Sequence, residues 1–414
     1  MNPDLSDSKR WLRRNSLALA LVWLVPWLLA PGPVRAEEAH RLQRSESCAA
    51  CHRTIYEEWR GSSMARTVEL SRWCLDGSHR ILDSVDRGRE IGRRCYSCHA
   101  PTAVFRGVTP YAPRDAAEGV GCDVCHSIAA VHVSSEPSES RLDLRPGAKR
   151  GTRADATAPH AVVVSELHGR GELCAGCHFF ADPANGLPVD WTYPQWLGSP
   201  QAARGETCQD CHMPRRPGRI SERPGDPVRT DVASHRFPGA RDLSTLRGAL
   251  RLGLEVEETT SGRVAVVEIE NVGAGHNVPG GGGGIRQLEL RLCATHGEGC
   301  DVLLARRAYE IRYFKADGTQ TGGSDPEATR FEDSGIRPGE TRTERVVLPE
   351  LPGGVRRIGA ELRFWYVSPE AQARSGVQLD AAIAGPVHVA DRRVEILHGA
   401  RTTRPGPSPV PPAS

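Results

Sequence analysis

The spacing of hydrophobic and polar residues changes at about residue 245. Beyond this point apolar residues recur at every second position, which is typical of strands with one buried face. Leu252, Leu254 and Val256 form one such run, Val264, Val266 and Ile269 belong to the next, and five more lie at 288–292, 309–314, 343–348, 360–367 and 387–397. Turn residues separate these runs, so the sequence predicts an antiparallel β-sandwich domain over residues 245–400.

The preceding residues, 37–244, are expected to form an α-helical and irregular domain. Helical spacing appears over 54–70, where Ile55, Tyr56, Trp59 and Met64 are the apolar and aromatic positions. Residues 134–159 lack periodicity and are rich in Ser, Arg, Gly and Ala, and 215–231 is rich in Pro, Gly and Arg. Both stretches are therefore predicted to be loops.

The two ends of the chain do not belong to either domain. Four basic residues before residue 15, an apolar run over 16–30 and a small-x-small site ending at Ala36 predict a cleavable export signal over 1–36. The apolar run is short for a membrane anchor and is broken by Pro26. The mature protein is expected to be periplasmic, secreted or on the cell surface, and peripheral membrane association remains open. Residues 401–414 form a Pro- and Ser-rich tail that is predicted to be disordered.

Composition narrows the classes of function. The formal net charge is +2, too small to indicate a nucleic-acid partner. Aromatic residues make up 5% of the chain, which is low for a domain that fills its core with side chains alone. A bound cofactor is expected to supply the missing apolar volume.

A pentapeptide of the form Cys-x-x-Cys-His indicates which cofactor this is. It occurs five times: Cys48, Cys51 and His52; Cys95, Cys98 and His99; Cys122, Cys125 and His126; Cys174, Cys177 and His178; Cys208, Cys211 and His212. The pattern is typical of c-type haem attachment, with two thioether bonds and the adjacent histidine as proximal iron ligand. Zinc knuckles or disulfides would not require a histidine after every second cysteine. The sequence therefore predicts five covalently bound c-type haems.

Each haem iron needs a sixth ligand unless it stays open. The candidates are His235, His276, His160, His168, His79 and Met64. His235 and His276 stand in loops bounded by Gly and Pro, and His276 would also tie the predicted sandwich to the haem domain. Met64 would raise the potential of its haem if it ligated the iron. It would alternatively fill the core beside the helix after the first motif.

The remaining cysteines and two tryptophan-containing stretches add two further features. Cys293 and Cys300 flank a short turn-like stretch and are expected to form a disulfide in an oxidising compartment, which leaves Cys74 unpaired with no assigned role. The pattern Trp-x-Gly-Ser-x-x-Ala begins at Trp59 and again at Trp196, each time between two Cys-x-x-Cys-His motifs. It is interpreted as a weak internal repeat, with coincidence as the alternative.

Several of these motifs resemble the cytochrome c554-like multihaem cytochromes. The pattern Cys-x-x-Cys-His-x3-Tyr-x2-Trp-x2-Ser over 48–62, the stretch Gly-Val-Gly-Cys-Asp-Val-Cys-His over 119–126, and 208–214 followed by Ser-His-Arg-Phe at 234–237 carry the resemblance. It covers roughly residues 45–240. The β-rich region, with Gly-His-Asn-Val-Pro-Gly over 275–280, resembles the C-terminal domain fused to some of these cytochromes. The resemblance implies electron transfer through packed haems, mostly with two axial histidines.

Three functions are compatible with these features. The first is an exported electron carrier that moves single electrons through five haems to redox proteins, by transient contacts below about 1,200 Å². The second is a multihaem oxidoreductase that acts on a small nitrogen or sulfur compound at one open iron. No Cys-x-x-Cys-Lys is present, the variant that some nitrite-reducing relatives use at the catalytic haem. The third is a subunit of an extracellular cytochrome assembly that docks through the sandwich. Whether the protein is an enzyme is thus left open, with the carrier preferred.

Overall fold

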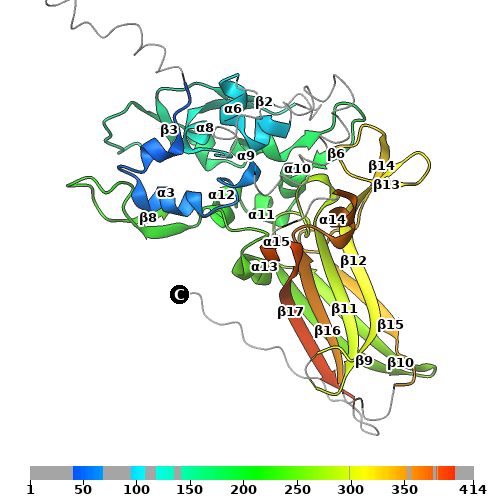
Figure 1. The fold of residues 1–414 in the computed structure, drawn as a ribbon. Coiled ribbons are helices and arrows are strands. Elements are labelled where there is room, and N and C mark those ends of the chain that lie inside the picture. The colour runs from blue at the N-terminus through cyan, green and yellow to red at the C-terminus, as the bar shows by residue number, and fades with distance from the viewer. Residues whose placement is uncertain are drawn as a thin grey trace, which may run out of the picture.

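The computed structural model describes residues 41–68, 95–107, 118–134, 141–297, 299–351, 355, 357–375, 379 and 381–396. Within them the chain forms a helical N-terminal unit and a sheet-rich C-terminal unit, which meet end to end (Figure 1). The predicted export signal, Cys74, His79 and the predicted C-terminal tail lie outside the described residues. No helix among the described residues is both long and apolar enough to cross a membrane.

The N-terminal unit consists of short helices and four two-stranded sheets. Its helices are η1 (Ser45–Cys48), α3 (Arg53–Arg60), α6 (Pro101–Phe105), α8 (Cys122–Ser127), η3 (Glu166–Gly169), α9 (Glu172–His178), α10 (Thr192–Leu197), α11 (Pro200–Ala203) and α12 (Cys208–His212). Its strand pairs are β1 (Ile128–His132) with β2 (Arg141–Leu144), β3 (Lys149–Gly151) with β4 (Val162–Val164), β5 (Phe180–Ala181) with β6 (Pro188–Asp190), and β7 (Arg215–Gly218) with β8 (Arg229–Ala233). The β3–β4 pair is parallel, and the other three are antiparallel.

Two stretches that were predicted as loops contain strands. Residues 134–159 include β2 and β3, and residues 215–231 include β7 and the start of β8. The prediction was wrong because strands of three to five residues are too short to show a period of two.

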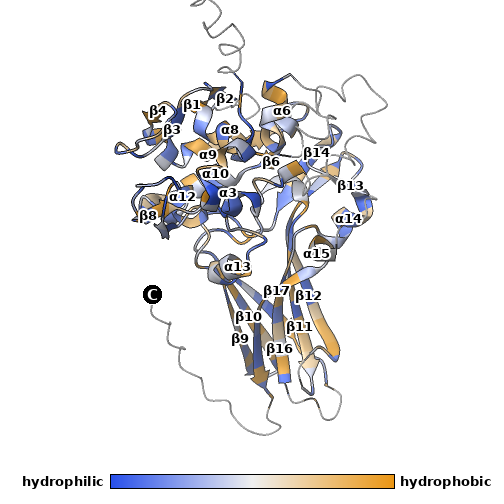
Figure 2. Ribbon diagram, turned by 60° about the vertical axis from the view of Figure 1, so that its left-hand side comes forward, coloured by the Kyte–Doolittle hydropathy of each residue, from blue (hydrophilic) through white to orange (hydrophobic). Residues whose placement is uncertain are grey.

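The helix predicted over 54–70 ends early, at Arg60. Gly61 is its C-cap, and the Ser62 hydroxyl then donates to the Trp59 carbonyl, 2.6 Å away. This hydrogen bond from a side-chain hydroxyl to the backbone favours a turn at the point where the helix would otherwise continue. Figure 2 shows α3 as a largely hydrophilic helix, in agreement with its sequence RTIYEEWR.

The C-terminal unit is built on two antiparallel sheets. One has the order β15–β10–β9, and the other has the order β13–β12–β11–β16–β17, with β14 also paired to β12. The strands are β9 (Leu250–Thr259), β10 (Gly262–Asn271), β11 (Gln287–Thr295), β12 (Val302–Lys315), β13 (Gln320–Thr321), β14 (Ala328–Asp333), β15 (Thr341–Val347), β16 (Arg357–Trp365) and β17 (Pro386–Glu395). Four short helices accompany them, α13 (Leu243–Ala249), η4 (Gly282–Gly284), α14 (Pro369–Ser375) and α15 (Ala381–Ala384). All seven predicted strands are present, whereas β13 and β14 were not predicted.

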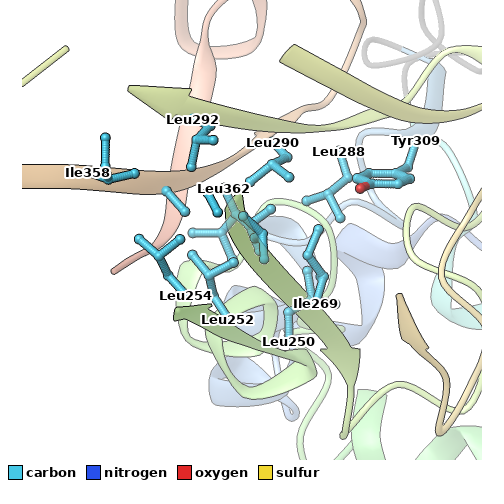
Figure 3. Packing of buried hydrophobic residues seen from close by; sticks show 14 of the residues in the cluster. Leu250, Leu252, Leu254, Ile269, Leu288, Leu290, Leu292, Tyr309, Ile358 and Leu362 are labelled. Atoms are coloured by element: carbon cyan, nitrogen blue, oxygen red, sulfur yellow. The ribbon is translucent and has the colours of Figure 1, made fainter. Parts of the chain in front are cut away.

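The two sheets bury their facing side chains against each other, which confirms the predicted antiparallel sandwich. Leu252 and Leu254 of β9 face Leu288 and Leu292 of β11 and Leu362 of β16 across the interior (Figure 3). Full burial of a leucine side chain contributes about 1.5–3 kcal/mol. This packing explains why the unit could be recognised from its alternating pattern.

The phase of one strand differs from the prediction. In β10 the side chains at 0% exposure are Ala265, Val267 and Ile269, not Val266, which is only half-buried. Residues 264–267 are all apolar, so the alternation alone could not decide which face points inward. The Cys293–Cys300 disulfide is present and confirms that prediction.

Candidate haem-binding site

The Cys-x-x-Cys-His motifs lie on single helical turns. The last three motifs lie on α8, α9 and α12, and residues 95–99 are helical as well. Residues at positions i, i+3 and i+4 of a helix share one face, so both cysteines and the histidine of a motif point the same way. The α12 turn is fixed by a capping box, in which the Thr207 hydroxyl and backbone N–H donate to Asp210 at 2.9 and 2.7 Å.

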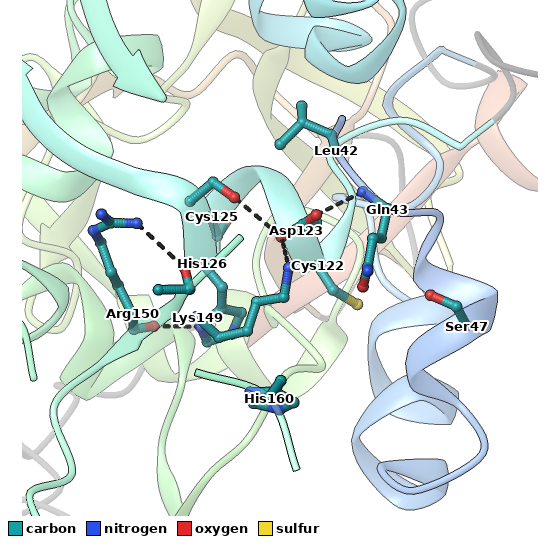
Figure 4. Close-up of polar contacts among 12 residues, drawn as sticks. Leu42, Gln43, Ser47, Cys122, Asp123, Cys125, His126, Lys149, Arg150 and His160 are labelled. Carbon is teal, nitrogen blue, oxygen red and sulfur yellow. Dashed lines mark hydrogen bonds and ion pairs between the residues drawn. The ribbon is translucent and has the colours of Figure 1, made fainter. Parts of the chain in front are cut away.

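The proximal histidines are oriented through their Nδ1 atoms. Three of them form a hydrogen bond between Nδ1 and a backbone carbonyl oxygen. The partners are Ile220 for His52 (2.7 Å), Arg150 for His126 (2.6 Å) and Pro238 for His212 (2.6 Å). Figure 4 shows the His126–Arg150 contact. A bond of this kind fixes the tautomer that leaves Nε2 free for a metal. His178 differs, because its Nδ1 lies 3.2 Å from Oδ2 of Asp190.

Three of the proximal histidines face a second histidine from elsewhere in the chain. The ring centroids of His52 and His160 lie 6.4 Å apart, those of His126 and His235 6.4 Å, and those of His212 and His276 6.3 Å. Two imidazoles bound to opposite sides of one metal at about 2 Å place their centroids roughly 6 Å apart. The three pairs therefore fit bis-histidine ligation of a haem iron.

His168 also lies near His126, with a centroid distance of 6.0 Å. Its ring nitrogens are both engaged, however, since Nδ1 lies 2.9 Å from the Ser165 hydroxyl and Nε2 lies 2.9 Å from the Cys125 carbonyl. His235 bonds the Ala233 carbonyl through Nδ1 at 3.0 Å, the same orientation that the proximal histidines adopt. Of the two rings beside His126, the geometry of His235 is the one suited to metal ligation.

Two loops hold the second histidines in place. The backbone N–H of His235 donates a hydrogen bond to the carboxylate of Glu58. This carboxylate also accepts from the Arg216 side chain at 2.6 Å, and Glu58 is 9% exposed. The His276 carbonyl accepts from the amide of Asn271, a residue that is 0% exposed, at 2.9 Å. The loop of His276 thus belongs to the sheet-rich unit but reaches into the helical one.

His99 and Met64 are held through hydrogen bonds to their backbone carbonyls. The His99 carbonyl accepts from the Thr67 hydroxyl at 2.7 Å. The Met64 carbonyl accepts from the Val120 N–H at 2.9 Å, which fixes the backbone of Met64 beside the third motif. His79 lies outside the described residues.

Burial sets the protonation of most of these rings. It lowers the pKa of His99, His126, His168 and His212, and it lowers the pKa of His235 and His276 to about 4. A neutral imidazole is the form that binds metals. At His178 burial also acts to lower the pKa, but the charge and hydrogen bond of Asp190 outweigh it and raise the pKa.

Contacts between cysteines show how the motifs are arranged in space. Three pairs of cysteines from different motifs lie next to each other: Cys48 with Cys122, Cys98 with Cys177, and Cys174 with Cys208. The first motif thus adjoins the third, and the fourth adjoins both the second and the fifth. Strand β1, which directly follows the helix of the third motif, packs against α9 of the fourth motif and connects these two groups. Haems attached at these cysteines would therefore form one array.

The internal repeat is present in three dimensions. The indole N–H of Trp59 donates to the Val120 carbonyl at 2.9 Å, and that of Trp196 donates to the Glu206 carbonyl at 3.0 Å. Val120 and Glu206 each stand two residues before the first cysteine of a motif. Each tryptophan therefore bonds the backbone that leads into the next motif of its copy.

The serines of the repeat are equivalent as well. The buried Ser62 hydroxyl accepts from the Ala65 N–H at 3.4 Å, and the buried Ser199 hydroxyl accepts from the Ala202 N–H at 3.1 Å. The first and third motifs and the fourth and fifth motifs are also related in the same way, because one cysteine of each motif lies next to a cysteine of the other. The array thus contains two copies of a two-motif module, with the second motif lying against the fourth.

Sequence reasoning missed the acidic residues that support the site. Asp123, within the third motif, is 2% exposed and accepts from the Gln43 N–H, the Ser127 hydroxyl and Lys149 (Figure 4). Glu58 and Asp190 were also overlooked. An acidic residue inside or just after a motif was the available signal, but its partners lie far along the chain and no local pattern identifies them.

Comparison with known proteins agrees with this geometry. Residues 47–127 match the family model described as cytochrome c554 and c-prime. The fold is similar to that of a penta-haem cytochrome c552 from Thermochromatium tepidum, with a TM-score of 0.65 and 22% sequence identity over 86% of this chain and 99% of that one. No curated protein matched the chain. Residues 47–127 are thus similar to the cytochrome c554 and c-prime family, and the chain shares the fold of a penta-haem cytochrome and has a sheet-rich C-terminal region.

Proposed function

We propose that this cytochrome is an exported electron carrier that transfers single electrons through five covalently bound haems. The ten motif cysteines would hold the haems, and His52, His99, His126, His178 and His212 would be the proximal ligands. When bound, the haems supply reversible one-electron chemistry. The protein fixes their spacing and tunes their potentials through ligands, hydrogen bonds and burial.

The observation that carries this proposal is the set of three facing histidine pairs. Centroid distances of 6.3–6.4 Å and hydrogen bonds from Nδ1 to backbone carbonyls support His160, His235 and His276 as distal ligands of the first, third and fifth haems. Two axial histidines occupy both faces of an iron, and such an iron exchanges electrons without binding substrate. His79 and Met64 remain candidates for the other irons, whereas both ring nitrogens of His168 are engaged by Ser165 and Cys125.

The contacts between motifs support transfer along the array. The thiol pairs link the first motif to the third and link the fourth to both the second and the fifth. Cys211 in the fifth motif is exposed, so this end of the array reaches the surface. Redox proteins would dock there through small, transient interfaces.

The site of action follows from the cofactor. Cytochromes of the c type are typically extracytoplasmic, and we propose that residues 1–36 are the cleaved signal that exports this one. Mass spectrometry of the mature protein tests both points. The expected result is a chain that begins at residue 37 and carries five haems.

Electron paramagnetic resonance of the oxidised protein tests the carrier role. Five low-spin irons that do not respond to nitrite or hydroxylamine, nor to carbon monoxide after reduction, are the expected result. A high-spin iron whose signal shifts when one of these ligands is added would contradict a pure carrier. It would favour an oxidoreductase that acts on a small nitrogen compound.

A further inference from the structure

The fourth motif differs from the three others whose proximal Nδ1 contact is described. His52, His126 and His212 each bond a neutral backbone carbonyl, whereas His178 bonds the carboxylate of Asp190 at 3.2 Å. A carboxylate bonded to the second nitrogen of a metal-ligating histidine makes the ring a more basic ligand. His178 is therefore expected to donate more electron density to its iron than the others do.

The Asp190 carboxylate is held rigidly beside His178. The β5–β6 hairpin pairs Asp190 with Phe180, which is two residues after His178. The other carboxylate oxygen, Oδ1, accepts from the Thr192 N–H at 3.0 Å. The neighbouring rings of Phe179 and Trp191 meet edge to face, with centroids 4.9 Å apart. The chain on both sides of the His178–Asp190 bond is thus fixed.

The sheet-rich unit supports the same hairpin. Tyr313 of β12 is 0% exposed, and its hydroxyl donates to the Pro188 carbonyl at the start of β6. Gly284 of η4 packs on the Tyr313 ring so closely that an added Cβ would lie 2.9 Å from it. Asp190 therefore lies in a strand that is held by contacts from both units. These contacts fix the position of its carboxylate relative to His178.

We propose that Asp190 is a positioning residue that makes the fourth haem the lowest-potential haem of the array. A more basic axial ligand stabilises the oxidised iron and lowers its potential. The thiol contacts Cys98–Cys177 and Cys174–Cys208 place this haem between the second and the fifth, so it stands at the branch of the electron path. The inference rests on the proposed haem array and adds the order of potentials within it.

The substitution Asp190→Asn tests this role, because asparagine has nearly the same size but carries no charge. One haem of the five is expected to be reduced more easily, with a roughly tenfold change in its oxidised-to-reduced ratio at fixed potential. For one electron this equals about 59 mV. The same haem should change its low-spin paramagnetic resonance signal, while the other four keep theirs. Spectroelectrochemical titration and paramagnetic resonance measure the two effects.

A matched control is Glu172→Gln, which removes a half-buried carboxylate from the helix that carries the fourth motif. Glu172 lies in the first turn of α9, two residues before Cys174, and not at the Nδ1 atom of His178. This control is expected to leave every low-spin signal unchanged. If it alters the signal of one haem as strongly as Asp190→Asn does, the loss of charge alone explains the effect and the proposal fails. Unchanged potentials in Asp190→Asn would also overturn it.

Haem content separates this test from the test of the array itself. Both variants are compared only if they retain the full haem count of the parent, and a parent with fewer than five haems refutes the array rather than the role of Asp190. If Asp190→Asn loses haem, Asp190→Glu keeps the charge and moves the carboxylate. An altered signal of a single haem is then expected, and an unaltered one would contradict the proposal.

Discussion

His212 and His276 lie with their rings almost parallel, 9° apart, although one is the histidine of the last haem motif and the other belongs to a loop of the β-sandwich. His212 is fixed by the Pro238 carbonyl, and His276 is fixed by the carbonyl of Asn277 at 3.0 Å. This pair joins the two units of the chain at the point where the fifth haem would sit. If His276 ligates the fifth iron as proposed, the sandwich contributes one residue to the cofactor site.

Replacing His276 by glycine should remove one axial ligand without adding bulk to the loop. We expect one of the five irons to become high-spin, and added imidazole to restore the low-spin signal, because it can occupy the same position. Paramagnetic resonance of the oxidised protein measures both changes. His296→Gly is the control, since His296 is exposed and bonds Asp301. A low-spin spectrum in His276→Gly would show that another residue ligates this iron.

The two histidines beside His126 make different predictions. His235→Ala should convert the third haem to a high-spin form, because Nε2 of His235 is oriented for metal ligation. His168→Ala should keep the low-spin spectrum, since the nitrogens of His168 bond Ser165 and Cys125. The two variants, measured side by side, assign the ligand. The reverse pattern of spin states would make His168 the ligand and remove His235 from the site.

These pairs mark the limit of what the sequence could predict. The five motifs are local, so the proximal ligands and the cofactor could be predicted from residue spacing alone. The choice of distal histidine depends on which loops meet in space, so the sequence favoured His235 but could not exclude His168, whose ring nitrogens bond Ser165 and Cys125. The Asp190 contact was invisible for the same reason, because a two-stranded hairpin brings it back to His178.

The sheet-rich unit shows the same contrast. Its strands were predictable because two facing layers enforce alternation of apolar and polar residues. The phase of β10 was not, since four apolar residues in succession satisfy either face. In the N-terminal unit the short strands β2, β3, β7 and β8 bury little of their own surface. Strands β2 and β3 contact the motif helices α9 and α8, and β7 pairs with β8, so tertiary contacts and not local periodicity determine where these strands form.

Gly119 should tolerate no side chain. It has φ +67°, and an added Cβ would lie 2.5 Å from the Met64 carbonyl and 2.6 Å from the Ala65 carbonyl. Left-handed backbone alone costs about 1–2 kcal/mol for other residues. Gly119→Ala should therefore lower the free energy of unfolding by more than that amount and weaken haem retention at the third motif. Denaturant titration with haem quantification measures both effects.

Gly107→Ala provides the comparison for this variant. Gly107 has φ +65°, but a Cβ added there would have no other atom within 4 Å. It should incur only the backbone cost. Equal destabilisation of the two variants would show that the contact with Met64 and Ala65 is not tight.

The Cys293–Cys300 disulfide should stabilise the sandwich without affecting the haems. It closes the β11–β12 connection across a sequence separation of 7. The entropy of closing so short a loop predicts a contribution of about 2.5 kcal/mol. The double variant Cys293→Ser, Cys300→Ser should unfold at lower urea concentration with an unchanged low-spin spectrum. A change in any haem signal would indicate that the hairpin is coupled to the haem array.

Asp242 should make stability depend on pH through the helix that connects the two units. Its carboxylate caps α13 by accepting from the Thr245 N–H at 2.8 Å, and hydrogen bonds from Ser244 and Thr245 lower its pKa below the ordinary value of an aspartate. A lowered pKa in the folded state stabilises the protein above the unfolded value, and this stabilisation is lost as the pH falls through the folded value. Asp242→Ala should therefore reduce stability by about 1 kcal/mol at neutral pH, with the difference from the parent shrinking below about pH 4.

Asp242→Asn retains the cap and removes the titration, so its stability should follow the parent at pH 7 and lack this acid-dependent component. The urea midpoints of unfolding of the parent and the two variants, measured at pH 7, 5 and 3, test this prediction. A constant difference in midpoint between Asp242→Ala and the parent across this range would show that the charge of Asp242 contributes nothing to the cap.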